Sequence, residues 1–140
     1  MLFRSGAEGK GLAIRWAHAG HAVALGSRSA EKAQAAAAEL NARLAATQSS
    51  NPHGAVTSIR GQANPAAAAD AEVVVLAVPF AAQRATVEEV RAELAGKILI
   101  DVSVPLDPEN PRKMKMPAAG SATEEAQALF GDATKVVAAL

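Results

Sequence analysis

A glycine-containing turn near the start of the chain has the residue types of a phosphate-binding loop. Residues 4–11 read Arg-Ser-Gly-Ala-Glu-Gly-Lys-Gly, and a helix is expected over Leu12–His18 directly after them. A dinucleotide loop needs glycine where the backbone turns tightly, where it approaches the pyrophosphate and where the helix packs on the strand. Gly6 and Gly9 have the spacing of the second and third of these glycines, whereas Arg4 stands at the first. The pattern indicates a phosphate site, and it fits a plain loop before a close-packed helix equally well.

A second polar cluster follows the strand-like stretch His21–Gly26. Ser27, Arg28 and Ser29 come directly after it, and Lys32 follows one helical turn later. In NAD-selective domains an acidic side chain near the end of this strand holds the ribose 2′-hydroxyl. Serines and an arginine suit a 2′-phosphate instead, because a guanidinium binds two phosphate oxygens at once and a helix N-terminus favours anions. The alternative is a solvated polar cap with Lys32 as an ordinary surface residue.

Short apolar runs alternate along the chain with longer alanine-rich stretches. Strands are predicted where apolar and β-branched residues run together: His21–Gly26, Val56–Ile59, Glu72–Val78, Lys97–Val102 and Lys135–Ala139. Helices are predicted over the stretches between them: Leu12–His18, Ala30–Thr47, a short helix from Asn64-Pro65, Ala81–Ala95 and Ser121–Phe130. Two segments have the composition of loops: Gln48–Gly54 and Pro105–Pro117.

Three residues are expected to mark helix ends. Ser29 and Asn64 are placed to cap helices, and Gly96 suits the left-handed position after a helix end. Strands separated by helices imply parallel pairing through right-handed crossovers. We therefore predict an α/β fold, a Rossmann-type doubly wound parallel sheet, in a single domain over residues 1–140.

The composition narrows the classes of function. The 140 residues include 36 alanines, and 14 basic residues balance 14 acidic ones, which is unlike a nucleic-acid binder or a polybasic membrane-surface protein. The absence of cysteine excludes disulfides, thiolate catalysis and cysteine-based metal sites. The longest uncharged apolar run, Val73–Ala82, is too short to span a bilayer, and we recognise no signal peptide. We expect a cytoplasmic protein with no nucleic-acid, membrane or metal partner.

The other residues with chemical potential form no recognisable catalytic set. Three histidines are expected in turns or on the surface: His18, His21 and His53. Asp101 stands at the end of a predicted strand, where a site role is open but a structural role is preferred. Met114 and Met116 alternate with lysines in the proline-rich loop, where a solvated loop is preferred over a ligand contact.

Several stretches together resemble one family of enzymes. They are GKGLAIRWAHAGHAVALGSRSAEKA, EVVVLAVPF, ILIDVSVPL and GSATEEAQALFGDATKVVAAL. In these stretches the chain is similar to the NADPH-dependent reductases of the deazaflavin coenzyme F420, and the similarity extends from Ser5 to Leu140. The GKGLA and GSR segments are the most specific, whereas AVP and VPL also occur in other small dinucleotide reductases.

The resemblance implies NADP(H) as the cofactor and coenzyme F420, a small-molecule redox partner, as the co-substrate. It implies that hydride passes directly between two bound rings, so that the protein chiefly holds them in near-attack geometry and no catalytic residue is expected. The cofactor-binding residues fall into three sets: Ser5, Gly6, Ala7, Glu8 and Gly9 at the pyrophosphate, Ser27, Arg28, Ser29 and Lys32 at the 2′-phosphate, and Phe80 and Val104 at the nicotinamide end.

Two departures from the family pattern bear on how much of the site is present. The family opens with a full strand and a glycine pair, whereas here Phe3-Arg4 replace the glycines and only four residues precede Ser5. The family also continues beyond Leu140 into residues that contact the deazaflavin. We therefore expect a member truncated at both ends, with a truncated first strand, that supplies mainly the NADP site. A homodimer is expected because dimers are the commonest oligomers.

Two alternatives stand beside this interpretation. Another small NADP-dependent reductase, similar to the pyrroline-carboxylate reductases, would share the nucleotide-binding start and the AVP strand. A non-catalytic NADP-binding module would fit a chain in which the second-substrate side is missing.

Overall fold

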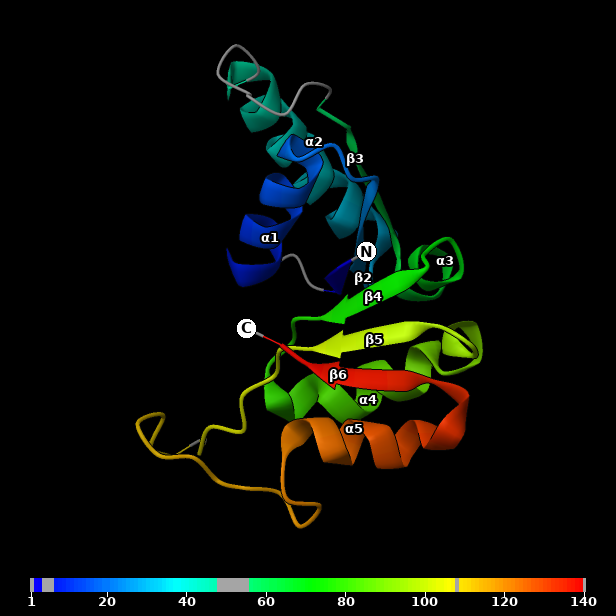
Figure 1. Cartoon of the computed structure of the whole chain (residues 1–140). Helices are drawn as coiled ribbons and strands as arrows, with labels where there is room; N and C mark the ends of the chain where they lie inside the picture. Colours follow the sequence, from blue (N-terminus) through cyan, green and yellow to red (C-terminus); the bar gives the residue numbers. More distant parts are fainter. Residues whose placement is uncertain (1, 4–6, 48–55, 108, 140) are drawn as a thin grey trace. The chain divides into compact units, whose positions relative to one another are not determined.

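The computed structural model describes residues 2–3, 7–47, 56–107 and 109–139. Contacts between Cα atoms divide the chain into two units, Met1–Ala71 and Glu72–Leu140. Figure 1 shows the first unit from blue to green and the second from green to red.

The described residues of the first unit form three parallel strands and three helices. The strands lie in the order β3-β2-β1, with Leu2 opposite Leu25 and Leu25 opposite Gly61. The strands are β1 (Leu2–Phe3), β2 (Val23–Ser27) and β3 (Ile59–Ala63), and the helices are α1 (Ala7–His18), α2 (Ala30–Thr47) and α3 (Asn64–Ala69). Helices α1 and α2 pack against each other and against β2 and β3 (Figure 1). The described part of the strand β1 has two residues.

The described residues of the second unit likewise form three parallel strands, joined by helices. They lie in the order β4-β5-β6, with Val74 opposite Leu99 and Leu99 opposite Val136. The strands are β4 (Val73–Leu76), β5 (Ile98–Asp101) and β6 (Lys135–Ala138), the helices are α4 (Phe80–Val90) and α5 (Ala122–Phe130), and two 3₁₀ turns are η2 (Ala92–Leu94) and η3 (Gly131–Ala133). Helices α4 and α5 pack side by side (Figure 1). Parallel strands joined by helices confirm the predicted α/β class.

Alanine decides how closely the helices approach the strands. Ala13 and Ala17 of α1 and Ala33 of α2 are completely buried, and so is Leu25 of β2. A methyl group at these positions lets a helix backbone come close to the sheet while remaining a strong helix former. The alanine-rich composition is therefore part of the core and not only a surface feature.

Predicted boundaries in the first unit differ from the structure. The strand predicted over His21–Gly26 is β2, Val23–Ser27. The strand predicted over Val56–Ile59 begins only at Ile59, because Thr57 donates its N–H to the carbonyl oxygen of Ala17 (3.1 Å) and its hydroxyl to that of His21. The first helix begins at Ala7 and not at Leu12. Local composition did not reveal the last two of these changes, because both depend on contacts between segments far apart in the sequence.

Most of the residues predicted to mark helix ends have that role in the structure. Ser29 and Ser121 each accept an N–H from the residue three positions later, at 3.3 and 3.1 Å. Gly96 has a φ of 75° and takes the left-handed conformation expected of it. Asn64 is a correction: it is the first residue of α3, the N-cap position is Ala63, and no side chain caps this helix.

The remaining elements of the second unit follow the prediction approximately. The helix predicted to Ala95 is α4, which starts at Phe80 and ends at Val90 before η2. The described residues of the segment Pro105–Pro117 form no helix or strand, and Leu106 and Met114 form an isolated antiparallel bridge. The loop predicted over Gln48–Gly54 lies outside the described residues.

Candidate functional site: the carboxyl ends of the strands

A compact polar turn lies where β2 ends and α2 begins. Ser27 is the last residue of β2, and its Oγ accepts the N–H of Ser29 at 3.3 Å. Ser29 caps α2 twice, since its Oγ accepts the N–H of Lys32 and its carbonyl oxygen accepts the N–H of Ala33. The short connection therefore brings both serine hydroxyls and the first turn of a helix together at the carboxyl end of a central strand.

The charge around this turn is mixed but mainly positive. Arg28 and Lys32 are exposed, and within the described part of the chain neither forms an ion pair. Glu31, in the first turn of α2, is the acidic neighbour. Unsatisfied amide groups and the dipole make a helix N-terminus favourable for anions. Two cations, two hydroxyls and this helix end form a donor set that fits a phosphate monoester.

Two residues that the sequence interpretation did not select hold this part of the unit together. Asn41 of α2 donates its Nδ2 to the carbonyl oxygen of Ile59 and accepts the N–H of Ile59 with its Oδ1, both at 2.8 Å. Gly61 of β3 lies directly against the backbone of α2 at Ala33 and Gln34. A glycine inside a strand is a known signal of close backbone approach, and this signal could have identified Gly61.

The predicted pyrophosphate turn is only partly described. Ser5 and Gly6 lie outside the described residues, as does Arg4. Ala7, Glu8 and Gly9 lie inside α1 and not in a loop before it, which corrects the predicted start of the helix. Glu8 is exposed and Gly9 is buried in the first turn.

Phe80 and Val104 lie in the second unit, each beyond the end of a strand. Phe80 is the first residue of α4 after β4, and Val104 follows β5 by three residues and is 50% exposed. The N–H of Val102 donates to the carbonyl oxygen of Leu76 at 3.2 Å, which keeps the exits of β4 and β5 side by side. Both residues therefore follow the carboxyl ends of neighbouring strands, the edge where open α/β sheets bind ligands.

Asp101 has the structural surroundings that the sequence favoured. It is 3% exposed, its Oδ2 accepts the Nε2 of Gln83 at 2.8 Å and its Oδ1 accepts the N–H of Ser103 at 3.0 Å. The same Nε2 donates to the carbonyl oxygen of Ala122 at 3.0 Å. The buried carboxyl group thus joins the end of β5 to Gln83 of α4, and Gln83 in turn binds the start of α5. The bond from Ser103 also shapes the turn that leads to Val104.

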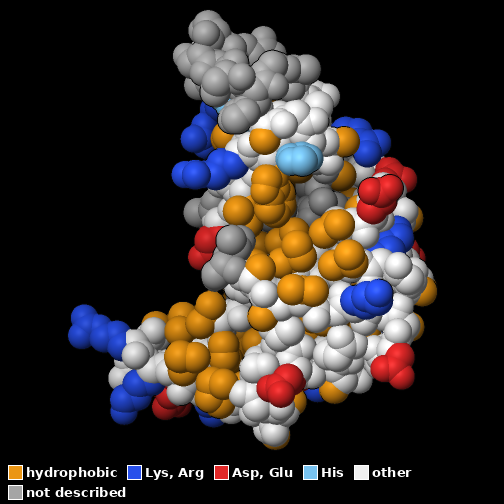
Figure 2. Space-filling view, viewed as in Figure 1, with side chains coloured by type: hydrophobic (Ala, Val, Ile, Leu, Met, Phe, Trp, Pro, Cys, Tyr) orange, Lys and Arg blue, Asp and Glu red, His pale blue; other side chains and the backbone are white. Residues whose placement is uncertain are grey.

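The histidine and methionine side chains considered from the sequence are half-buried or exposed where the structure describes them. His18 is half-buried in α1, His21 is exposed after it, and His53 lies outside the described residues. Met114 and Met116 are exposed. The two methionines belong to the loop Pro105–Pro117. Figure 2 shows apolar side chains gathered in the region where Figure 1 places this loop, with Lys and Arg side chains nearby.

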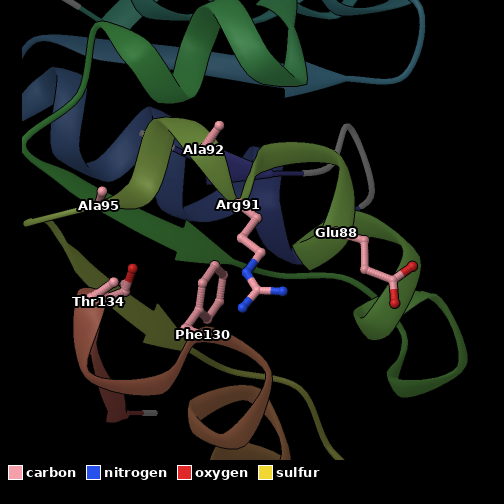
Figure 3. Close-up of a pocket in the computed structure, with 7 residues that line it drawn as sticks. Glu88, Arg91, Ala92, Ala95, Phe130 and Thr134 are labelled. Atoms are coloured by element: carbon pink, nitrogen blue, oxygen red, sulfur yellow. The ribbon is translucent and has the colours of Figure 1, made fainter.

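A surface pocket lies elsewhere in the second unit. It has a volume of about 460 Å³ and is lined by Glu88, Arg91, Ala92, Ala95, Phe130, Ala133 and Thr134. In Figure 3 the Arg91 side chain extends toward Phe130. Ala95 and Thr134 precede β5 and β6, so the pocket lies at the amino ends of these strands, away from Phe80 and Val104. Ligands in open α/β sheets bind at the opposite ends.

Two further kinds of feature are absent from the described residues. No described helix combines the length and hydropathy that a membrane span needs. No group of three or more His, Cys, Asp or Glu side chains within the described ranges is arranged to hold a metal ion.

Comparisons with known proteins show the family to which the chain belongs. A sequence model of the family described as NADP oxidoreductase, coenzyme F420-dependent, matches residues 3–105, a range that includes every predicted site residue from Ser5 to Val104. The F420-dependent NADP reductase of Methanothermobacter thermautotrophicus is 44% identical over 103 residues, which are 74% of this chain and 41% of the relative. The F420-dependent NADP reductase of Methanocaldococcus jannaschii is 33% identical and covers 99% of this chain and 60% of its own length.

Solved structures extend the comparison to the fold. A candidate F420-dependent NADP reductase from Arthrobacter sp. FB24 matches 98% of this chain and 60% of its own, with a TM-score of 0.72 and 31% identity. A pyrroline-5-carboxylate reductase from Coxiella burnetii, at 17% identity and a TM-score of 0.60, shares the fold alone. The fold is of the Rossmann type, and the chain spans about half the length of the curated relatives that it matches. By its sequence match over most of its length, the chain belongs to the family of coenzyme F420-dependent NADP oxidoreductases.

Proposed function

We propose that this chain supplies the NADP-binding part of an oxidoreductase that transfers hydride between NADPH and coenzyme F420. The observation that carries the proposal is the Ser27-Arg28-Ser29 turn at the carboxyl end of β2, with the N-terminus of α2 behind it. Membership of the family supports the choice of both substrates. It also favours F420 over the imine substrates of the pyrroline-carboxylate reductases, whose similarity to this chain is limited to the fold.

In this proposal the turn binds the 2′-phosphate. The guanidinium of Arg28 pairs with two phosphate oxygens, and the ammonium group of Lys32 adds a second positive charge. The hydroxyls of Ser27 and Ser29 and the first-turn amides of α2 donate further hydrogen bonds. Because Glu31 lies in the same helical turn, the site is expected to favour the phosphate by a few charge-assisted hydrogen bonds and not by a large net charge.

The nicotinamide end is assigned to the second unit. When bound, the nicotinamide donates or accepts the hydride. Phe80 and Val104 provide apolar surface beyond the ends of β4 and β5, which positions a flat ring and excludes water from it. Direct transfer between two rings needs orientation and no protein acid or base. The sequence features extend the proposal to a cytoplasmic location, a small-molecule redox partner and a homodimer.

The test is the preference for NADPH over NADH and its dependence on Arg28. We expect the chain to bind NADPH more tightly than NADH, and Arg28→Glu to abolish or reverse the preference because it replaces the phosphate-binding cation with an anion. Losing two charge-assisted hydrogen bonds should weaken NADPH binding by about tenfold to a thousandfold. Fluorescence titration with each nucleotide measures both affinities.

Arg15→Glu is the matched control for this experiment. Arg15 is an exposed residue of α1, so the substitution makes the same change in net charge away from the turn and should leave the preference unchanged. Equal affinities of the unmodified chain for the two nucleotides would remove the 2′-phosphate assignment.

A further inference from the structure

We propose that Gly61 is a positioning residue that sets the NADPH preference by letting the first turn of α2 lie close to the end of β2. This inference rests on the proposed function. Gly61 touches no part of the predicted phosphate site, so its effect on the nucleotide would pass through the helix.

The contact at Gly61 is between two backbones. A Cβ atom added there would overlap with the carbonyl carbon and oxygen of Ala33 and with the amide nitrogen of Gln34. A backbone atom cannot rotate away as the end of a side chain can. By contrast, a Cβ added at Gly11 of α1 meets nothing within 4 Å. Any side chain at position 61 must therefore move α2 away from β3.

A second contact determines how α2 would move. Asn41 holds the backbone of Ile59 through two hydrogen bonds of 2.8 Å, two turns further along the helix. At 1.5 Å per residue, Ala33 lies about 12 Å and Ser29 about 18 Å from Asn41 along the helix. With Asn41 as the pivot, a displacement at Ala33 is enlarged about one and a half times at Ser29.

The predicted phosphate site lies at the N-terminal end of α2, which is the end that moves most. Restoring ordinary van der Waals contact at position 61 requires a shift of roughly 1 Å or more. The hydrogen bonds that join Ser27 to Ser29 and Ser29 to Lys32 are already 3.3 Å long. Such a shift separates the Ser29 hydroxyl and the Lys32 ammonium group from Ser27 and Arg28, so the four groups no longer converge on one phosphate. A nucleotide without the 2′-phosphate loses little.

The experiment uses two small nucleotides that differ only in this phosphate. Adenosine 2′,5′-bisphosphate and 5′-AMP are titrated calorimetrically into the unmodified chain, Gly61→Ala and the control Gly11→Ala. We expect Gly61→Ala to lower the affinity for the bisphosphate by about tenfold or more, because charge-assisted hydrogen bonds are lost, and to change 5′-AMP binding by less than about twofold. Gly11→Ala should change neither affinity.

Each outcome has a separate meaning. A selective loss supports the positioning role, whereas an unchanged ratio in folded Gly61→Ala, or an equal loss for both nucleotides, overturns it and leaves the proposed function intact. If the unmodified chain does not distinguish the two nucleotides, the 2′-phosphate assignment and this inference both fail. Should Gly61→Ala not fold, Asn41→Ala decides, because it removes the two hydrogen bonds of the other contact that holds α2 against β3 and must show the same selective loss.

Discussion

Arg28 and Asp101 both lie at the end of a parallel strand, but their surroundings give them different uses. Arg28 is exposed, and in the described part of the chain no acidic side chain pairs with it. Asp101 is buried and each of its oxygens already accepts a hydrogen bond, from Gln83 and from Ser103. The two residues therefore have similar positions in the fold. Arg28 is the candidate site residue because its donors are available to an external ligand, whereas Asp101 is structural because its oxygens are already hydrogen-bonded.

The buried pair of Gln83 and Asp101 leads to a stability prediction. Asp101→Asn should destabilise the protein by about 1–3 kcal/mol, because an amide donor then faces the Nε2 of Gln83. Gln83→Met should also destabilise it, because the Asp101 carboxyl group and the Ala122 carbonyl oxygen lose their shared donor. Urea unfolding of both single variants and the double variant measures the coupling between the two side chains.

The two losses should not add. Since both substitutions remove one shared interaction, the double variant is expected to be more stable than the sum of the single effects predicts, by about 0.5–3 kcal/mol. Additive losses would mean that the two side chains stabilise the fold independently.

At the scale of helices and strands, tertiary contacts set boundaries that differ from those that local sequence patterns predict. The strand β3 contains Gly61 and Gln62, which have little strand preference, and it forms because β2 pairs with it and Asn41 holds its first residue. The helix α1 includes Gly9 and Gly11, which destabilise helices locally. The buried Ala13 and Ala17 provide packing that outweighs this preference.

A pair of side chains also joins α1 to α2. Lys10 and Glu39 form an ion pair with a separation of 2.5 Å, and the hydrogen bond from Lys10, with its positive charge, lowers the pKa of Glu39 from its usual 4.5. Because the pKa is lower in the folded state, the pair stabilises the fold above the unfolded-state pKa and loses this effect as the pH falls through the folded-state value. Both side chains are partly or largely exposed, so the effect should be small and sensitive to salt.

We therefore expect Glu39→Gln to lower Tm slightly at pH 7 and to have no effect at a pH well below 4.5. Thermal unfolding of the two proteins at several pH values measures this difference. A difference that does not change with pH or with added salt would show that the ion pair contributes nothing.

At the scale of the whole molecule, the two ends of the proposed nucleotide are assigned to different units. The 2′-phosphate is assigned to Ser27–Lys32 in the first unit and the nicotinamide to Phe80 and Val104 in the second. A binding test on the first unit's residues alone therefore does not establish the proposed reaction.

The corresponding prediction concerns hydride transfer itself. With NADPH and oxidised F420, one NADPH and one proton should be consumed for each F420 reduced, and NADH should support little reduction. The absorbance of oxidised F420 measures the reaction. Tight NADPH binding without any reduction or binding of F420 would favour the non-catalytic NADP-binding module instead.

The sequence by itself determined the α/β class and the order of the elements, and it led to the proposed phosphate site at Ser27–Lys32, because hydrophobic period, helix caps and side-chain chemistry are local properties. The family resemblance to F420-dependent NADP reductases could also be read from local motifs. The tertiary structure alone decided that β3 starts at Ile59, that Asp101 is committed to Gln83 and Ser103, and that the backbone lying against Gly61 is that of α2. These features depend on which distant segments pack together, and no local sequence pattern shows which segments are in contact.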